Sequence, residues 1–212
     1  RRGSRNYTGP SPGSGHVVKP AQRHRDTVLA ALSYEEIGGS AALANSMRNL
    51  VSQVENPLRQ AILELINEPD AAVLLADRIA AARVLGKLGD PRFPIEPTQW
   101  RAEALPQTFG QQASYWCLLP AGEYTIGGWQ EQEEPAPSAD VALKRFWIAR
   151  FPVTVAQFAT FIEHGGYAPE GERWWTKRGW QWKRGDPETM QPEYWKQAEY
   201  SEANQPVIGV SW

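Results

Sequence analysis

Apolar residues recur every three or four positions through residues 22–90, which is the spacing of amphipathic helices. An apolar stretch at residues 27–32 belongs to a first predicted helix, which ends near Gly38-Gly39. Ser40 is the expected N-cap of a second helix over residues 41–54. Apolar side chains share one face of that helix. They are Leu43, Met47, Leu50, Val51 and Val54.

Two further helices are predicted before the pattern changes. Asn56-Pro57 combines a capping residue with a proline at the first helical position, so a new helix is expected to start there. Another runs from residue 77 to a stop at Gly89-Asp90-Pro91. The core candidates of these two helices are Leu58, Ile62, Leu63, Leu65, Ile66, Ile79, Ala82, Val84, Leu85 and Leu88. Short helices joined by short turns resemble a helical hairpin or a HEAT-like unit.

From Ser114 onward the pattern becomes that of short strands. Residues 116–119 and 124–126 are two apolar runs separated by the turn Pro120-Ala121-Gly122. Together they predict a β-hairpin that is closed by Gly127-Gly128.

A further strand and one main helix follow. Residues 141–148 alternate as a strand does, and Pro152 ends the run. Thr154 is the expected N-cap of a helix over residues 155–164, which Gly165-Gly166 terminates. The residues expected to face inward are Val155, Phe158, Phe161 and Ile162, and both phenylalanines are expected to be buried. The residues after this helix lack periodicity and predict long ordered loops.

These patterns divide the chain into four segments. Residues 1–20 are rich in Gly, Ser, Pro and Arg and predict a flexible linker. The alternative for this segment is a basic arm that docks on a partner or exposes a cleavable arginine. A helical segment (21–92), a connection (93–112) and a second domain (113–212) follow, so the expected fold class is α+β.

Composition argues against several classes of protein. A net charge of −2 argues against a dedicated nucleic-acid-binding protein, which would carry a basic excess. No apolar run reaches the roughly 18–20 residues that a membrane span needs, and no signal peptide is visible. The single cysteine, Cys117, fits a reducing compartment, so a cytoplasmic location is expected. The chain opens without an initiator methionine, and we expect it to be a piece of a longer protein.

Tryptophan is unusually frequent and unevenly placed. Nine of the ten tryptophans lie from Trp116 onward, and large aromatic side chains are favoured at binding surfaces. Four of them interleave with Lys and Arg over residues 173–183. This pattern fits single-stranded nucleic acid, a surface for a peptide or small ligand, or rings that fill space in a fold with little regular structure. The candidate ligand-binding residues are Tyr167, Trp174, Trp175, Trp180 and Trp182.

Several motifs in register now point to one family. The segments LLPAGEYTIGG, FWIARFPVTVAQFATFIEHGGY, WW, GWQW, PEYW and NQPVIGVSW follow one another across residues 114–212. This series resembles the formylglycine-generating-enzyme (sulfatase-modifying factor) domain. The resemblance implies a variant of the C-type lectin fold, of which this chain carries the N-terminal half. The ending LGKLGDPRF of the helical segment is also similar to what often precedes such domains in large bacterial signalling proteins.

The chain departs from the family pattern at residues that bear on chemistry. Gln205 stands where the family commonly has His, and Ile126 where it commonly has Met. Formylglycine-generating enzymes hold copper with a cysteine pair in the distal part of the domain, whereas Cys117 lies near its start and reads as a core residue. His16, His24 and His164 have no spacing that suits a metal site. We therefore predict no catalytic residue, no metal ligand and no cofactor in this chain.

Two functions from different classes follow from the resemblance. The first is a non-catalytic recognition or regulatory module of a larger bacterial signalling or defence protein, linked to a caspase-like protease or an NTPase domain. Its partner would be another protein, a ligand or the rest of the parent chain, with no nucleic acid and no membrane. The alternative is a copper-dependent oxidase of the formylglycine-generating type, whose catalytic cysteines lie beyond residue 212. A product released by a partner protease is a third possibility.

Overall fold

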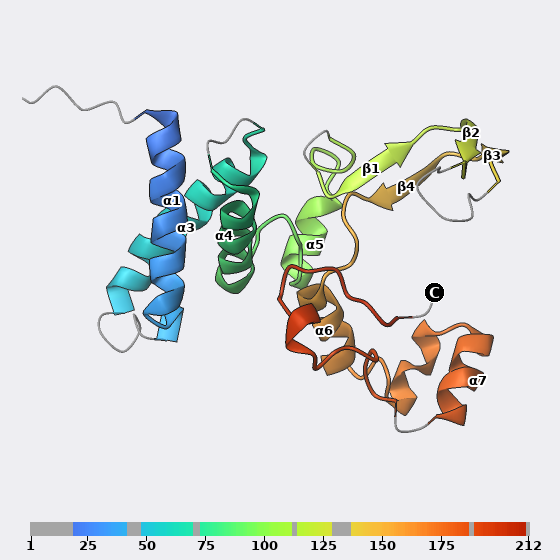
Figure 1. Cartoon of the computed structure of the whole chain (residues 1–212). Helices are drawn as coiled ribbons and strands as arrows, with labels where there is room; N and C mark the ends of the chain where they lie inside the picture. Colours follow the sequence, from blue (N-terminus) through green and yellow to red (C-terminus); the bar gives the residue numbers. More distant parts are fainter. Residues whose placement is uncertain are drawn as a thin grey trace, which may run out of the picture. The chain divides into compact units, whose positions relative to one another are not determined.

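The computed structural model describes most of the chain and divides it into two compact units (Figure 1). The units are Arg1–Leu85 and Gly86–Trp212. The described residues are 19–41, 48–69, 73–111, 114–128, 137–186 and 189–210. The predicted linker therefore lies almost entirely outside the described residues. In the described parts of the chain, no helix is both long and apolar enough to cross a membrane.

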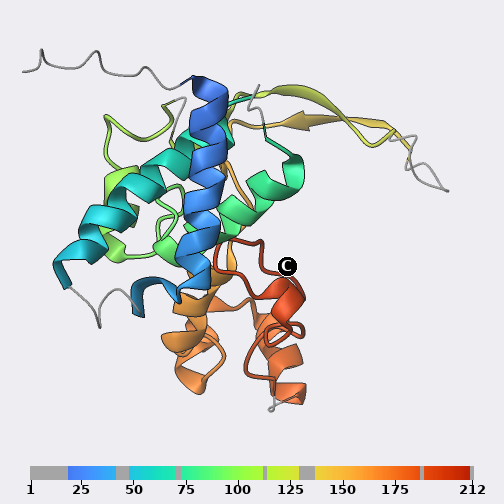
Figure 2. The same ribbon diagram turned by 60° about the vertical axis from the view of Figure 1, so that its left-hand side comes forward.

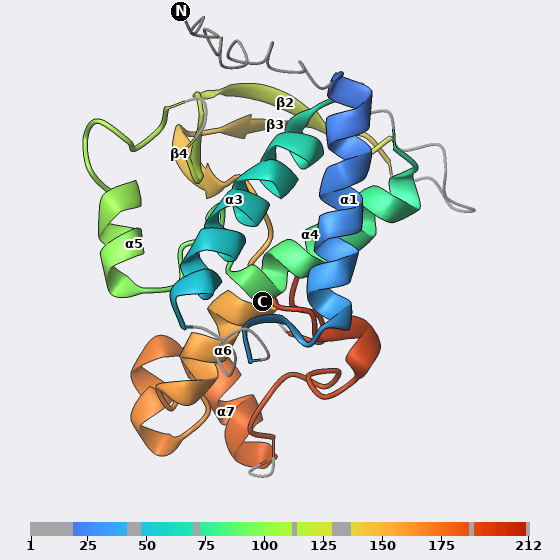
Figure 3. The same ribbon diagram turned by 90° about the vertical axis from the view of Figure 1, so that its left-hand side faces the viewer.

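The first unit is helical, as its sequence pattern predicts. Helix α1 (Pro20–Glu36) packs against α3 (Arg48–Asn67), and α4 (Leu75–Leu88) contributes its first eleven residues to the unit (Figures 2 and 3). The buried apolar side chains of this unit are Val28, Ala31, Tyr34, Leu58, Ile62, Leu65, Ala81, Val84 and Leu85. The Tyr34 hydroxyl donates a hydrogen bond to Glu55 Oε1 at 2.6 Å, which ties the end of α1 to α3. Burial is the main cause that raises the pKa of Tyr34 above its usual value.

Two details of this unit differ from the sequence prediction. Pro57 does not start a helix but lies inside α3. The Asn56 side chain accepts a hydrogen bond from Arg59 at 2.7 Å instead of capping a helix end. The buried residues of α3 that the structure describes all follow the proline, at Leu58, Ile62 and Leu65. Packing of this part of the helix can override the local proline signal. Ile79 was expected in the core and is 47% exposed. The helix expected over residues 41–54 falls partly outside the described residues.

The second unit is a mixture of helices and strands. The predicted connection contains the short helix α5 (Pro97–Glu103), whose start carries a reciprocal capping box between Glu96 and Gln99. Trp100 of this helix packs edge-on against Tyr115, with ring centroids 5.2 Å apart. This contact places α5 beside the first strand.

The strands form one long two-stranded arm, so the predicted hairpin of adjacent runs is wrong (Figures 1 and 2). Strand β1 (Trp116–Leu119) pairs with β4 (Phe146–Ala149), and β2 (Gly122–Ile126) pairs with β3 (Ala139–Leu143), both antiparallel. The register of one pair continues into the other across Pro120. Proline has no N–H to donate, so it interrupts the ladder without turning the chain.

The predicted Thr154 cap is confirmed. Helix α6 (Val155–Glu163) begins after Thr154, whose hydroxyl accepts from the Gln157 backbone N–H at 3.3 Å. Gly165 follows the helix with a φ of 77°, which suits glycine. The expectation that Phe158 and Phe161 are buried is wrong, because both are only half-buried. Both rings line a pocket, whereas Val155 and Gln157 of the same helix are buried.

The aromatic region after α6 is more regular than its sequence indicates. It contains a 3₁₀ helix, η1 (Pro169–Trp174), and a second helix, α7 (Lys177–Gly185), which is as long as α6. A third short element, η2 (Ala198–Tyr200), follows. Thr176 caps α7 by accepting from the Gly179 N–H at 3.0 Å. Thr176 could therefore have predicted the start of α7 from the sequence. The helix itself was missed because the closely spaced tryptophans do not follow the helical period.

The last described segment binds the start of α6. Val155 N–H donates to Gln205 O at 2.8 Å, and Val207 N–H donates to Val153 O at 2.9 Å. The Asn204 amide reaches Asp90 Oδ2 at 3.3 Å. Residues far apart in the sequence are therefore joined at the N-terminus of one helix.

Gln157 is the polar centre of this junction. Its side-chain oxygen accepts from Thr154 N–H at 3.0 Å, and its amide nitrogen donates to Pro94 O at 3.0 Å and to the Tyr115 hydroxyl at 3.4 Å. Because the group is buried, each of these bonds replaces one that water would otherwise make.

Replacing Gln157 with Met should therefore lower the free energy of unfolding by about 1–3 kcal/mol, because buried polar groups lose their partners. Urea denaturation of the purified protein measures this. The matched control is Gln99→Met, which removes the same capping-box role at an exposed position and should cost clearly less. Equal losses in the two variants would contradict the proposed role of Gln157.

Gly171 allows a close approach of two backbone segments. A Cβ added at this buried residue would lie 2.4 Å from Gly166 O and 2.5 Å from Gly165 O. Gly171→Ala should cost about 1–3 kcal/mol through overpacking. Gly185→Ala is the control, because its added Cβ meets nothing within 4 Å. Thermal unfolding should separate the two variants, and a stable Gly171→Ala protein would refute the close approach.

Candidate functional site: an aromatic pocket beside α6

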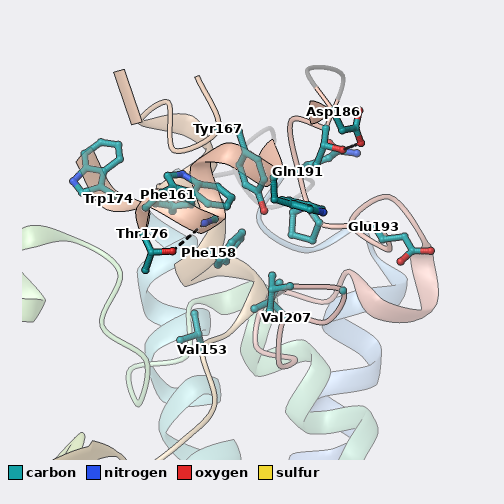
Figure 4. Close-up of a pocket in the computed structure, with 17 residues that line it drawn as sticks. Val153, Phe158, Phe161, Tyr167, Trp174, Thr176, Asp186, Gln191, Glu193 and Val207 are labelled. Carbon is teal, nitrogen blue, oxygen red and sulfur yellow. Dashed lines mark hydrogen bonds between the residues drawn. The ribbon is translucent and has the colours of Figure 1, made fainter. Parts of the chain in front are cut away.

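A pocket of about 640 Å³ opens between α6, the turn before η1, α7 and the C-terminal segment (Figure 4). Volumes of this order are typical of small-molecule sites. Its described lining residues are Val153, Phe158, Phe161, Tyr167, Trp174, Trp175, Thr176, Gly179, Trp182, Asp186, Thr189, Gln191, Pro192, Glu193, Val207, Gly209 and Val210. Apolar and aromatic side chains therefore dominate the wall.

Tyr167 lies between other rings of the aromatic wall. Its ring centroid lies 5.9 Å from that of Phe161 and 5.3 Å from that of Trp175. Trp175 is fixed in turn, because its indole N–H donates to Gly166 O at 2.7 Å. Burial raises the pKa of the Tyr167 hydroxyl, so the group stays neutral at ordinary pH. The wall is thus held in place by contacts within the domain.

Three tryptophans of this region differ sharply in exposure. Trp174 and Trp182 are 47% and 55% exposed, whereas Trp180 is 7% exposed. Trp174 lies 5.8 Å from Phe161, and the Arg173 guanidinium stacks 4.5 Å from the Trp174 ring centroid. Trp180 packs against Trp175 at 5.9 Å, and its indole N–H has no hydrogen-bond partner among the described residues. Trp174 and Trp182 can therefore meet a ligand, and Trp180 supports the fold.

The charged side chains among the described lining residues are acidic. Asp186 and Glu193 are exposed and lie on one side of the pocket, while Trp174 and Phe161 lie on the other (Figure 4). The Asp186 carboxylate accepts a hydrogen bond from the Thr189 hydroxyl. The pocket thus has an aromatic side and an anionic side.

A smaller pocket of about 290 Å³ shares part of this wall. It has Val153, Phe158 and Phe161 in common with the first and adds Trp100, Tyr115 and Gln157. The half-buried face of α6 therefore borders both spaces.

Comparison with known proteins identifies the second unit. The model of the sulfatase-modifying factor enzyme 1-like domain matches residues 102–212, which is more than half of the chain. The chain belongs to this family. The resemblance carried by the sequence motifs is therefore confirmed.

Several curated relatives of the sulfatase-modifying factor family align with part of the chain. The hercynine oxygenase of Mycolicibacterium smegmatis is 34% identical over 85 residues, which is 37% of this chain and 19% of the relative. The hercynine oxygenase of Mycobacterium tuberculosis is 39% identical over 31% of this chain and 14% of the relative. The formylglycine-generating enzyme of that organism is 38% identical over 55 residues, 26% of this chain and 18% of the relative. The chain thus spans less than a fifth of these relatives.

The described residues do not by themselves fit the copper site that the family resemblance implies. Among them, no group of three or more His, Cys, Asp or Glu side chains could hold a metal ion. Cys117 is half-buried on β1, opposite Ile148 of β4. His164 Nδ1 lies 2.8 Å from Thr160 O at the end of α6. His16 falls outside the described residues, and His24 belongs to the first unit.

The structure gathers most of the sequence-predicted site residues of this sulfatase-modifying factor-like domain. Tyr167, Trp174, Trp175 and Trp182 line one pocket, whereas Trp180 does not. Sequence reasoning missed Phe158, Phe161, Asp186 and Glu193, which also line it. Phe158 and Phe161 were assigned to the core on helical spacing alone. The two acidic residues gave no signal, because they are separated in sequence and only the fold places both in the wall of one pocket.

Proposed function

We propose that this sulfatase-modifying factor-like domain is a non-catalytic recognition or regulatory module that binds a protein or ligand at the aromatic pocket. It would serve a larger bacterial signalling or defence protein in the cytoplasm, linked to a protease or NTPase domain. The observation that carries the proposal is the pair of exposed rings, Trp174 and Trp182, on the wall of a pocket.

Two physical arguments support recognition at this place. An exposed tryptophan ring is unfavourably hydrated, so its burial by a partner is favourable. Such residues therefore dominate many binding energies. The wall behind them is preformed, since Tyr167 and Trp175 are fixed by ring contacts and a hydrogen bond. A preformed wall lowers the entropy that binding must overcome.

Two finer structural features belong to the same proposal. The domain would be the N-terminal half of a C-type-lectin-like fold, which agrees with its mixture of short strands, short helices and long loops. The helical unit would be HEAT-like, which agrees with the packing of α1 against α3.

Indole is the probe that tests recognition at the pocket. Saturable binding of indole by isothermal titration calorimetry is expected for the unaltered protein. Trp182→Ala should weaken it about tenfold, which is about 1.4 kcal/mol, while leaving the thermal midpoint nearly unchanged because the ring is 55% exposed.

Two controls make this test specific. Trp180→Ala removes a buried ring and should lose about 3–5 kcal/mol of stability through a cavity. Ile148→Ala removes an exposed apolar side chain on β4, outside the pocket, and should bind indole normally. If Trp174→Ala and Trp182→Ala lose stability as Trp180→Ala does, without a selective loss of binding, recognition at this pocket is refuted.

The alternative is an oxidase of the formylglycine-generating type, whose copper-binding cysteines lie beyond residue 212. The relatives favour it, because their names are those of an oxygenase and a formylglycine-generating enzyme. Sequencing the coding region beyond the codon for Trp212 separates the two functions. A distal cysteine pair would favour the oxidase, and a continuous family domain that lacks the pair would favour recognition.

A further inference from the structure

We propose that the pocket selects an amphiphilic amine, a small molecule with an aromatic or aliphatic body and one cationic amino group. This proposal rests on the proposed function and adds the chemical class of the ligand. The occupant would place its body on the aromatic side and its amino group at Asp186 and Glu193.

The charge of the pocket wall determines which ligand charge is favoured. Asp186 and Glu193 are both acidic, and no Lys or Arg is among the described lining residues. An anionic ligand would therefore meet like charge, whereas a cation would meet opposite charge.

The basic groups of the same region lie outside the described lining of the pocket. Lys183 is 5% exposed, and its ammonium donates to the backbone oxygen of Asp186 at 3.3 Å. Arg173 stacks on Trp174, and Arg184 pairs with Glu172 at 3.6 Å. Neither Arg184 nor Glu172 lines the pocket. The two carboxylates are therefore the charged side chains that the described lining presents to a ligand.

The positions of these groups set the shape of the ligand. The carboxylates lie across the pocket from Trp174 and Phe161 and do not form a cage with the rings (Figure 4). A lone cation enclosed by aromatic faces would need the rings around it. Here the two halves are separated, which suits a molecule that is apolar at one end and cationic at the other.

Three ligands that share one ring test this inference. Tryptamine, indole and indole-3-propionate present the same indole with a positive charge, no charge and a negative charge. Calorimetry should give tryptamine about fivefold tighter than indole, and indole-3-propionate weaker than indole. The advantage of tryptamine should fall as salt is added, because both carboxylates are exposed.

Charge-removing variants locate the effect. Asp186→Asn combined with Glu193→Gln keeps the shape of both side chains, and should abolish the advantage of tryptamine over indole. Glu170→Gln is the control, since this exposed acid does not line the pocket, and it should leave the whole series unchanged.

The outcomes separate this inference from the proposed function. If all three ligands bind equally to the unaltered protein but Trp182→Ala still weakens them, the selection for amines is wrong and recognition at the pocket stands. Preference for indole-3-propionate would also overturn the inference. If none of the three binds, the proposed function fails together with it.

Discussion

The buried hydrogen-bond junction around Gln157 is the constraint on which the second unit depends. One amide joins the start of α6, the backbone at Pro94 and the hydroxyl of Tyr115. Beside it, the segment around Gln205 pairs with the first N–H groups of α6. The described residues of this domain form two short strand ladders, which is little sheet to organise it. An unmade polar contact in its interior would be costly. Segments distant in sequence are therefore held in one arrangement.

That junction also borders the pockets, because Gln157 lines the smaller one beside Phe158 and Phe161. Val155 and Gln157 are buried, whereas the two phenylalanine rings remain half-buried. The aromatic wall continues from these rings to Tyr167. Gly171 lets the backbone at Gly166 come close, which positions Gly166 O to accept from the Trp175 indole. The buried junction and the pockets thus share residues of one helix, and a change in the first would be felt in the second.

The pocket offers the two chemistries that the proposed recognition of small amphiphiles would require. Its rings contribute area without many rotatable bonds, so ordering them on binding costs little entropy. Its carboxylates face solvent, so they would select the charge and orientation of a ligand more than they would add to its affinity. Membership of the sulfatase-modifying factor family supplies the scaffold, and function is argued from the site because one fold can host many activities.

Local signals in the sequence determined the cap at Thr154, the extent of α6, the ends of α1 and α4 and the family. Each depends on residues within a few positions of one another, where backbone sterics and hydrogen bonding act directly. Four of the five predicted site residues line one pocket for the same reason, since they are close together in the chain. Strand pairing was decided by the tertiary structure, because β1 pairs with a strand some thirty residues away.

Trp180 and Trp182 show most clearly what the sequence alone could not determine. They are two positions apart on α7, so they point to opposite faces. Only packing against Trp175 determines that Trp180 is buried and Trp182 is left to meet a ligand.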